Sequence, residues 1–254
     1  MIEIHSLSCS FSGGMFSRNR FMAVSPISAS FKNGGRYAIV GESGSGKTTL
    51  ARMIAGLQRP GGGNVVIDNE LVYGKRQGVR KGHFKKVQII QQNSASALDP
   101  KMAVGKSIEE PLCCFFHMGK AERQKRCREL MAMCNLPVDY YARLPSELSG
   151  GEQKRVAIAR ALAAEPECLI FDEATNGFDL PLRKKIVEEI IDLQRKVKFT
   201  LIFITHDMEL AVVVADEILV MKDSRVVEQV AFSGDASVFT NEYSRVLLEA
   251  SGIR

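Results

Sequence analysis

Tryptophan is absent from this sequence, and so is any hydrophobic run long enough to cross a bilayer. The longest apolar segments lie at residues 199–204 and 211–215, whereas a membrane-spanning helix needs about 20 apolar residues. Residues 1–5 also lack the basic region and apolar core that begin a signal peptide. We therefore expect a protein that stays in the cytoplasm.

The chain also lacks the cysteine spacing that holds structural metals. Its six cysteines form no C-x-x-C pair, so neither a zinc knuckle nor an iron–sulfur cluster is indicated. We expect reduced and mostly buried thiols at Cys9, Cys113, Cys114, Cys127, Cys134 and Cys168.

No long basic segment with interleaved aromatic residues is present, although the net charge is +5. Basic residues occur in short groups at 85–86, 123–128 and 184–185, which is typical of a solvated surface. Nucleic acid is therefore not an expected partner. With 254 residues, of which 45% are hydrophobic, the chain can bury a large core and form one or two structural units.

What the sequence does contain is a glycine-rich phosphate-binding loop (P-loop). The segment GESGSGKT at 41–48 fits G-x-x-x-x-G-K-[ST], follows a strand pattern at 37–40 and precedes a helical pattern at 49–55. Glycines let backbone N–H groups turn towards phosphate oxygens, and the helix N-terminus adds partial positive charge. Lys47 is predicted to reach the β- and γ-phosphates, and Thr48 to offer its hydroxyl to Mg²⁺. The predicted nucleotide-binding residues are Gly41, Glu42, Ser43, Gly44, Ser45, Gly46, Lys47, Thr48 and Thr49.

Alternating apolar strands and helices predict an α/β protein with a parallel sheet covered on both faces. Expected strands lie at residues 2–11, 24–32, 37–40, 65–67, 87–90, 168–171, 200–204 and 218–221, and expected helices at 49–55 and 182–196. From 104 to about 145 the pattern is helical and rich in charge, which predicts a helical insertion between two parallel strands.

Two carboxylates follow the strand predicted at 168–171, at the sheet edge where ligands bind in such folds. Asp172 is predicted to hold Mg²⁺, directly or through water, and Glu173 to polarise an attacking water molecule. A strand that ends in two acids is by itself more often a solvated strand end. The preceding P-loop favours the functional interpretation.

His206 follows the strand predicted at 200–204 and should emerge at the same sheet edge as Lys47 and Asp172. A lone histidine is more often structural than catalytic. At a strand end beside a phosphate site, however, we expect it to form a hydrogen bond with the γ-phosphate.

A second anion-binding helix N-terminus is predicted at residues 148–153. Ser149 stands where a helix begins, and Gly150 and Gly151 let the backbone approach a ligand closely. The sequence LSGGEQKRVAIARAL at 148–162, followed by CLIFDE at 168–173, closely resembles the signature of the ATP-binding cassette (ABC) ATPases. The motifs occur in the family's order over nearly the whole chain.

This resemblance implies the P-loop NTPase fold, with a RecA-like parallel sheet and an N-terminal antiparallel β subdomain. A single ABC ATPase domain would span residues 1–254, with a helical signature subdomain inserted at about 93–160. The family dimerises head to tail, so Ser149, Gly150 and Gly151 would act on the γ-phosphate bound by the second copy. Gln92, in preference to its neighbour Gln91, matches the Q-loop glutamine that contacts Mg²⁺ and the attacking water.

Two further residues are assigned by the resemblance. Phe11 matches the aromatic residue that stacks on adenine, and the strand pattern leaves open the alternative of a buried phenylalanine. Asp179 matches the D-loop aspartate that communicates across the dimer. Residues 176–178 depart from the family, because Asn-Gly-Phe stands where Ser-Ala-Leu is usual. This change bears on coupling rather than on hydrolysis.

Within the family, the sequence is most similar to the oligopeptide, dipeptide and nickel importer ATPases. The similarity lies in VGESGSGK at 40–47, QN at 92–93, SALDP at 96–100 and THD at 205–207. Many of these ATPases carry a cysteine-containing extension that has no counterpart here, so nickel and metal chelates stay as open as peptides. ATP and Mg²⁺ are the implied cofactors.

The implied partners are transmembrane permease subunits, a second ABC ATPase copy in a homodimer or heterodimer, and an extracytoplasmic substrate-binding protein. The protein would lie on the inner face of the cell membrane. The alternatives are an exporter ATPase, or an ABC ATPase that acts on nucleic acid or ribosomes. Only about 100 residues separate the P-loop from the signature, too few for the long coiled-coil insertion of the DNA-repair members.

Overall fold

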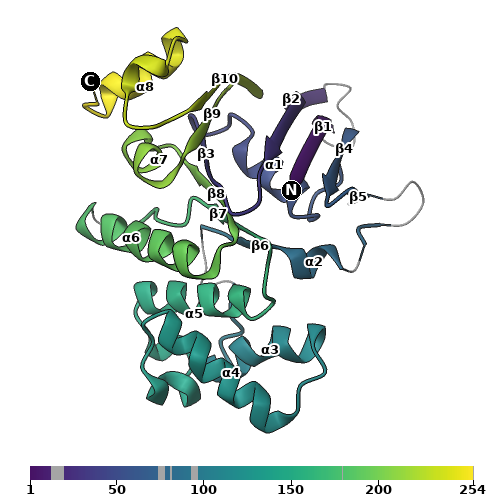
Figure 1. The fold of residues 1–254 in the computed structure, drawn as a ribbon, viewed down its shortest axis with the longest axis vertical. Helices are drawn as coiled ribbons and strands as arrows, with labels where there is room; N and C mark the ends of the chain where they lie inside the picture. The colour runs from purple at the N-terminus through teal and green to yellow at the C-terminus, as the bar shows by residue number, and fades with distance from the viewer. Residues whose placement is uncertain (13–19, 74–77, 81, 93–96, 179, 254) are drawn as a thin grey trace. The chain divides into compact units, whose positions relative to one another are not determined.

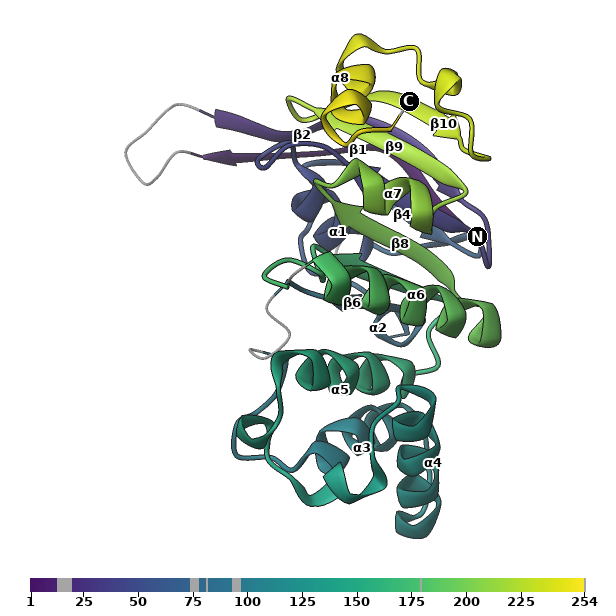
Figure 2. The same cartoon turned by 90° about the vertical axis from the view of Figure 1, so that its left-hand side faces the viewer.

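The computed structural model describes residues 1–12, 20–73, 78–80, 82–92, 97–178 and 180–253. The chain divides into two compact units, of which one comprises Met1–Phe84 with Phe199–Arg254 and the other Lys85–Lys198. Figure 1 labels the helices and strands, and Figure 2 shows them from another side.

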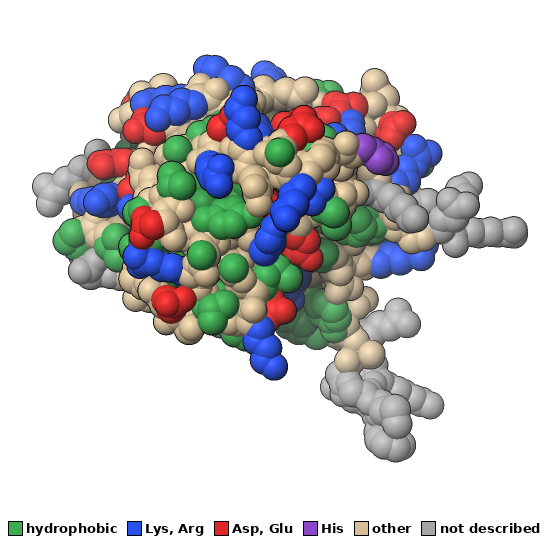
Figure 3. Space-filling view, turned by 90° about the horizontal axis from the view of Figure 1, so that it is seen from below, with side chains coloured by type: hydrophobic (Ala, Val, Ile, Leu, Met, Phe, Trp, Pro, Cys, Tyr) green, Lys and Arg blue, Asp and Glu red, His purple; other side chains and the backbone are tan. Residues whose placement is uncertain are grey.

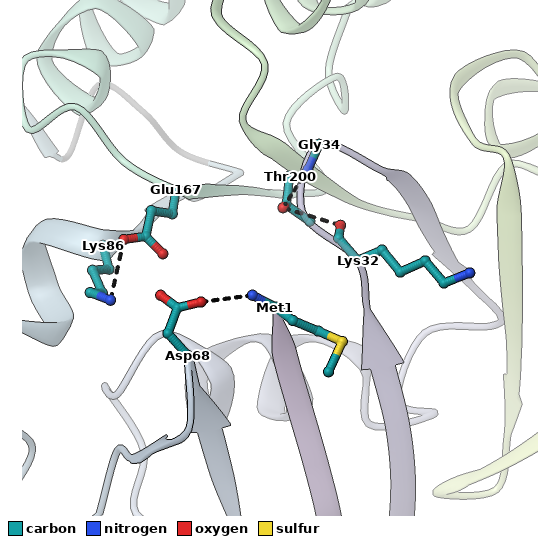
Figure 4. Close-up of polar contacts among 7 residues, drawn as sticks. All are labelled: Met1, Lys32, Gly34, Asp68, Lys86, Glu167 and Thr200. Atoms are coloured by element: carbon teal, nitrogen blue, oxygen red, sulfur yellow. Dashed lines mark hydrogen bonds and ion pairs between the residues drawn. The ribbon is translucent and has the colours of Figure 1, made fainter.

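The first unit begins with an antiparallel sheet in the order β2-β1-β4-β5. Its strands are β1 (Ile2–Ser12), β2 (Arg20–Phe31), β4 (Gly62–Ile67) and β5 (Glu70–Leu71). Along β1 the apolar side chains of Ile2 and Ile4 are buried, as the period of two in a half-buried strand requires. The N-terminal ammonium of Met1 donates to Asp68 in the β4–β5 turn at 2.8 Å (Figure 4). The antiparallel N-terminal sheet is thus confirmed.

The same unit contains four strands of a mainly parallel sheet, in the order β10-β9-β3-β8. Here β3 (Arg36–Val40) runs parallel to both β8 (Thr200–Thr205) and β9 (Glu217–Lys222), and β10 (Arg225–Ala231) is antiparallel to β9. The helices are α1 (Lys47–Ile54), α7 (Met208–Val214), α8 (Glu242–Ala250) and the short η4 (Ala236–Val238). Residues of α7 and α8 pack with β3 and β9 in one buried cluster. At the start of β8, the Thr200 hydroxyl accepts a hydrogen bond from the Gly34 N–H and donates one to the Lys32 carbonyl (Figure 4).

The second unit pairs β6 (Val87–Ile90) with β7 (Cys168–Asp172) in parallel. The chain enters β6 through α2 (His83–Lys86), and Lys86 forms a 3.2 Å ion pair with Glu167 before β7 (Figure 4). The helical insertion contains α3 (Val104–Phe115), α4 (Lys120–Met133), η2 (Val138–Ala142), η3 (Pro145–Glu147) and α5 (Gly150–Leu162), and α6 (Leu180–Val197) comes after β7. Arg155 of α5 and Glu189 of α6 form two hydrogen bonds of 2.7 and 3.1 Å.

The predicted strands, the two predicted helices and the helical insertion are confirmed. The sequence pattern misses β5, α2, α7, β10, η4 and α8. Side chains along β10 are mostly half-exposed, so the strand lacks the clean alternation that marks a buried face. The seven residues of α7 are almost all apolar and too few to show a helical period.

The six cysteines are free thiols, and four of them are buried, as predicted, while Cys113 and Cys114 are exposed. Burial raises the pKa of Cys127 and of Cys134 to about 12, so both stay protonated at neutral pH. Within the described ranges, no helix combines the length and apolarity that a membrane crossing requires. On the face seen in Figure 3, basic and acidic side chains are interspersed with hydrophobic ones.

Packing in the second unit requires a glycine at position 105. A Cβ atom there would lie 2.2 Å from Cδ2 of Tyr141. The Tyr141 hydroxyl donates to the buried carboxylate of Glu109, which also accepts from the Lys106 ammonium at 3.0 Å. Cys127 of α4 donates from Sγ to the Gly105 carbonyl at 3.5 Å. Elements α3, α4 and η2 therefore meet at Gly105, where there is no room for a side chain.

We predict that Gly105→Ala lowers the free energy of unfolding by about 1–3 kcal/mol, because the methyl group overpacks against Tyr141. This loss outweighs the gain of about 1 kcal/mol in helix propensity. Chemical denaturation measures the change. Gly119→Ala is the matched control, since no atom lies within 4 Å of a Cβ there, and should cost less than about 1 kcal/mol. A Gly105→Ala protein as stable as the wild type would contradict this packing.

Candidate functional site

The P-loop lies between β3 and α1, and two of its glycines are required by close backbone contacts. A Cβ at Gly41 would lie 2.0 Å from the Met221 carbonyl oxygen of β9. A Cβ at Gly46 would lie 2.3 Å from the Ala23 carbonyl oxygen of β2, and Gly46 has a left-handed φ of 100°. Neighbouring strands therefore hold both ends of the loop, and no other residue fits there.

The ammonium of Lys47 is held inside this loop. It is 3% exposed and donates to the carbonyl oxygens of Gly41 at 2.7 Å and Glu42 at 2.6 Å, and to Ser45 Oγ at 3.3 Å. These three acceptors all belong to the loop itself, so the loop fixes the position of the ammonium group. Thr48 follows at the start of α1 and is half-buried. The arrangement is a preformed cationic cradle for an anion.

His206 lies beside the P-loop in the first unit. Strands β3 and β8 are parallel and in register, with Val40 opposite Thr205, so Gly41 and His206 are the first residues beyond the two strand ends. His206 is exposed. Asp207 caps α7 by accepting from the backbone N–H of Glu209 at 2.9 Å, which fixes the chain directly after the histidine.

Phe11 lies near the end of β1 in the same unit and is 43% exposed. The alternative of a buried strand phenylalanine is therefore wrong. Its exposed ring is available for stacking, as the adenine assignment requires.

In the second unit, the acidic pair follows β7. Ile90 of β6 is opposite Phe171 of β7, so the Q-loop and Asp172 begin at the same edge of this parallel pair. Asp172 is 5% exposed. Glu173 has a left-handed φ of 49°, which costs a residue with a side chain roughly 1–2 kcal/mol. Backbone strain of this kind is concentrated at functional sites.

Asn176, one of the residues that make the D-loop sequence unusual, forms hydrogen bonds with Glu173. Its side-chain amide donates to Glu173 Oε2 at 2.7 Å, and its backbone N–H donates to the Glu173 carbonyl at 3.1 Å. The amide therefore holds the Glu173 carboxylate in one orientation. Asp179, the other D-loop residue of interest, lies outside the described residues.

The signature begins at a fully formed helix cap. Ser149 and Glu152 form a capping box at the start of α5, in which the Glu152 carboxylate accepts from the Ser149 N–H at 2.8 Å. Among the described residues, a Cβ at Gly151 would meet no atom within 4 Å, and one at Gly150 would meet only Phe178, at 3.6 Å. Packing among the described residues therefore does not require glycine at either position.

Lys154 is buried and makes a contact that the sequence does not predict. It is 2% exposed, and its ammonium donates to the carbonyl oxygens of Gln91 at 3.2 Å and Gln92 at 3.3 Å. Burial lowers the pKa of Lys154 to about 8. The signature helix α5 is thereby bonded to the start of the Q-loop, in which the Gln92 side chain is exposed. The only signal in the sequence is that a lysine occupies a position on the buried face of α5. The motif does not indicate which residues that lysine contacts.

Tyr243 of α8 makes a second contact that no pattern in the sequence indicates. The backbone N–H of Glu42 in the P-loop donates to the Tyr243 hydroxyl at 3.2 Å. The ammonium of Lys222 lies 4.6 Å from the centre of the tyrosine ring. The C-terminal helix therefore supports the P-loop, about 200 residues away in the chain.

The predicted site residues thus form two groups. Phe11, the P-loop and His206 belong to the first unit, and Gln92, the signature, Asp172 and Glu173 belong to the second.

Comparisons with known proteins identify the family. The family model described as ABC transporter matches residues 24–176. The dipeptide transport ATP-binding protein DppF of Escherichia coli (strain K12) is 33% identical over 94% of this chain and 72% of its own length. The nickel import ATP-binding protein NikE of Escherichia coli O6:K15:H31 is 33% identical over 98% of this chain and 94% of its own length.

Solved structures give the same result. The ATP-binding cassette MJ0796, solved as a dimer in a post-hydrolysis state bound to ADP and Pi, matches with a TM-score of 0.80 and 29% identity over 92% of this chain and all of that one. The cbiO1 protein of Clostridium perfringens, part of the ABC transporter complex cbiONQ, matches with a TM-score of 0.78 and 26% identity over 99% and 92% of the two chains. The fold, the motifs and the relatives agree, and this chain belongs to the ABC transporter family as an ATP-binding subunit with an ABC-type ATPase fold.

Proposed function

We propose that this chain is the ATP-hydrolysing subunit of an ABC importer for peptides or for nickel or another metal chelate. The observation that carries the proposal is the P-loop cradle, in which the buried Lys47 ammonium donates to loop carbonyls and His206 follows the end of the strand next to the loop. Curated relatives that match 94% or more of this chain are named for dipeptide transport and nickel import, which supports the import direction.

ATP would bind with its phosphates in the loop at 41–49. Lys47 would exchange its hydrogen bonds with loop carbonyls for bonds with the β- and γ-phosphates. We assign Mg²⁺ to Thr48, Gln92 and Asp172, because hydroxyl, amide and carboxylate oxygens are the hard ligands that this ion prefers. The burial of the Asp172 carboxylate fits such a role. Bound Mg²⁺ would supply charge neutralisation at the phosphates.

Glu173 would orient and polarise the attacking water, in line with the γ-phosphate. Asn176 would keep the Glu173 carboxylate in place through its 2.7 Å hydrogen bond. His206 would form a hydrogen bond with the γ-phosphate, and Gln92 would contact the water. Catalysis in this scheme consists of positioning and charge stabilisation, with no covalent intermediate.

Two copies, or this chain and a similar subunit, would close head to tail around ATP. Ser149, Gly150 and Gly151 would then contact the γ-phosphate held by the P-loop of the second copy, with Asp179 at the dimer contact. The open space at Gly151 and the helix N-terminus behind it support this assignment. Hydrolysis would remove the bridge and let the copies separate.

The transport pathway itself would belong to permease subunits on separate chains. This subunit would lie on the inner face of the cell membrane and pass its closure to the permeases through the Q-loop and the helical insertion. An extracytoplasmic binding protein would deliver the cargo. Whether that cargo is a peptide or a metal chelate would be decided by those partners.

We predict that Glu173→Gln lowers the rate of ATP hydrolysis by about 100-fold or more, because the amide cannot polarise water. ATP affinity should change by no more than about twofold, since the phosphate cradle is intact. Steady-state hydrolysis and equilibrium ATP binding measure the two effects. Glu188→Gln, at an exposed position of α6, is the control and should behave as the wild type. Full turnover by Glu173→Gln would refute the role of Glu173.

The importer assignment is tested by purifying tagged Glu173→Gln protein from native membranes with ATP and Mg²⁺. Because the stalled variant stays in the closed state, we expect membrane-spanning permeases and a second ATPase subunit to be recovered with it. The same purification without ATP is the control. Recovery of ribosomes or nucleic acid, or of no membrane subunit, would contradict the transport function.

A further inference from the structure

Phe21 is the most exposed large hydrophobic side chain in the described part of the chain, at 63%. It lies directly opposite Phe11 in the antiparallel pair of β1 and β2. Residues that face each other in such a pair project from the same side of the sheet, with Cβ atoms about 4.5–5.5 Å apart. Phe11 and Phe21 thus form one exposed aromatic surface, called here the aromatic pair.

A bulge in β2 determines which side of the sheet carries this pair. Ala23 is an extra residue, because its neighbours Val24 and Met22 pair with consecutive residues of β1. Ala23 and Val24 are both buried. The alternation then puts Phe21 on the same side as Ala23 and Met22 on the opposite side. On β1 the same alternation puts Phe11 on the side of the buried Cys9.

The P-loop approaches β2 at this bulge. A Cβ at Gly46 would lie 2.3 Å from the Ala23 carbonyl oxygen and 3.3 Å from Cγ2 of Val24. Lys47, the cation of the cradle, is the next residue. Phe21 lies two residues from Ala23, about 7 Å along an extended strand. This separation is one that the ribose of a nucleotide spans.

We propose that Phe21 joins Phe11 in binding the purine base of the nucleotide whose phosphates occupy the P-loop. This inference rests on the proposed binding of ATP and adds a residue that the family motifs do not assign. Aromatic stacking on a base is tolerant of base identity, because every base has a π-face. The pair would therefore hold the base by its planar face and would not read the hydrogen-bonding edge of adenine.

Among the described residues, Phe11 and Phe21 leave 43% and 63% of their surfaces exposed. At 63% exposure, truncation of Phe21 leaves no cavity in the core, so the variant is expected to fold. Met22, the adjacent residue, is 48% exposed on the opposite side of the sheet and is the matched control.

The test is calorimetric binding of two probes, Mg²⁺–ATP and Mg²⁺–tripolyphosphate, to the wild-type protein and its variants. Tripolyphosphate occupies the P-loop but has no base. We expect Phe21→Ala to weaken ATP binding about tenfold and to leave tripolyphosphate affinity within about twofold. Phe21→Tyr, which keeps the ring, should retain ATP affinity. Met22→Ala should leave both probes unaffected.

Unchanged ATP affinity in Phe21→Ala, together with weakened affinity in Phe11→Ala, would overturn the role of Phe21 while ATP binding stands. Equal weakening of ATP and tripolyphosphate would also overturn it, because the effect would then lie in the P-loop rather than at the base. A wild-type protein that binds neither probe would overturn the proposed nucleotide binding itself.

Discussion

The position of the Lys47 ammonium is the constraint on which the rest of the first unit depends. A cation that is 3% exposed needs polar partners, and the carbonyls of Gly41 and Glu42 supply them. Those carbonyls point inward only because the loop bends at glycines pressed against β2 and β9. Strand register then places His206 beside the loop, and the bulge at Ala23 puts Phe21 on the same side of the sheet as Ala23. The strands of the sheet thus fix the shape of the loop, and the loop fixes the position of the Lys47 ammonium that would meet the phosphates.

Sequence alone predicts the parts of this site that obey local rules. A glycine-rich segment between a strand and a helix indicates the P-loop, and parallel strands of apolar residues indicate that Asp172 and His206 follow strand ends. The capping box of Ser149 and Glu152 is likewise a local pattern. The strands and the helical insertion are predictable for the same reason, because hydrophobic periodicity reports burial within one element.

The sequence could not predict contacts that depend on tertiary placement or on the geometry of one particular turn. The bonds from Lys154 to the Q-loop, from Glu42 to Tyr243 and from Asn176 to Glu173 each depend on tertiary placement or on a specific turn geometry. The bulge at Ala23 could not be predicted from the sequence either. It matters because a shift of one residue in strand pairing reverses the side of the sheet that Phe21 faces. These four features adjust the orientation of groups whose presence the motifs already indicate.

The most direct test of the account is the association state of Glu173→Gln protein in analytical ultracentrifugation, with ATP and Mg²⁺ or with ADP and Mg²⁺. The account predicts a dimer with ATP and a monomer with ADP, because the γ-phosphate connects the P-loop of one copy with Ser149 and Gly151 of the other. It further predicts that Ser149→Arg abolishes the ATP-dependent dimer. A Glu173→Gln protein that binds ATP and remains monomeric would contradict the claim that two copies complete the site.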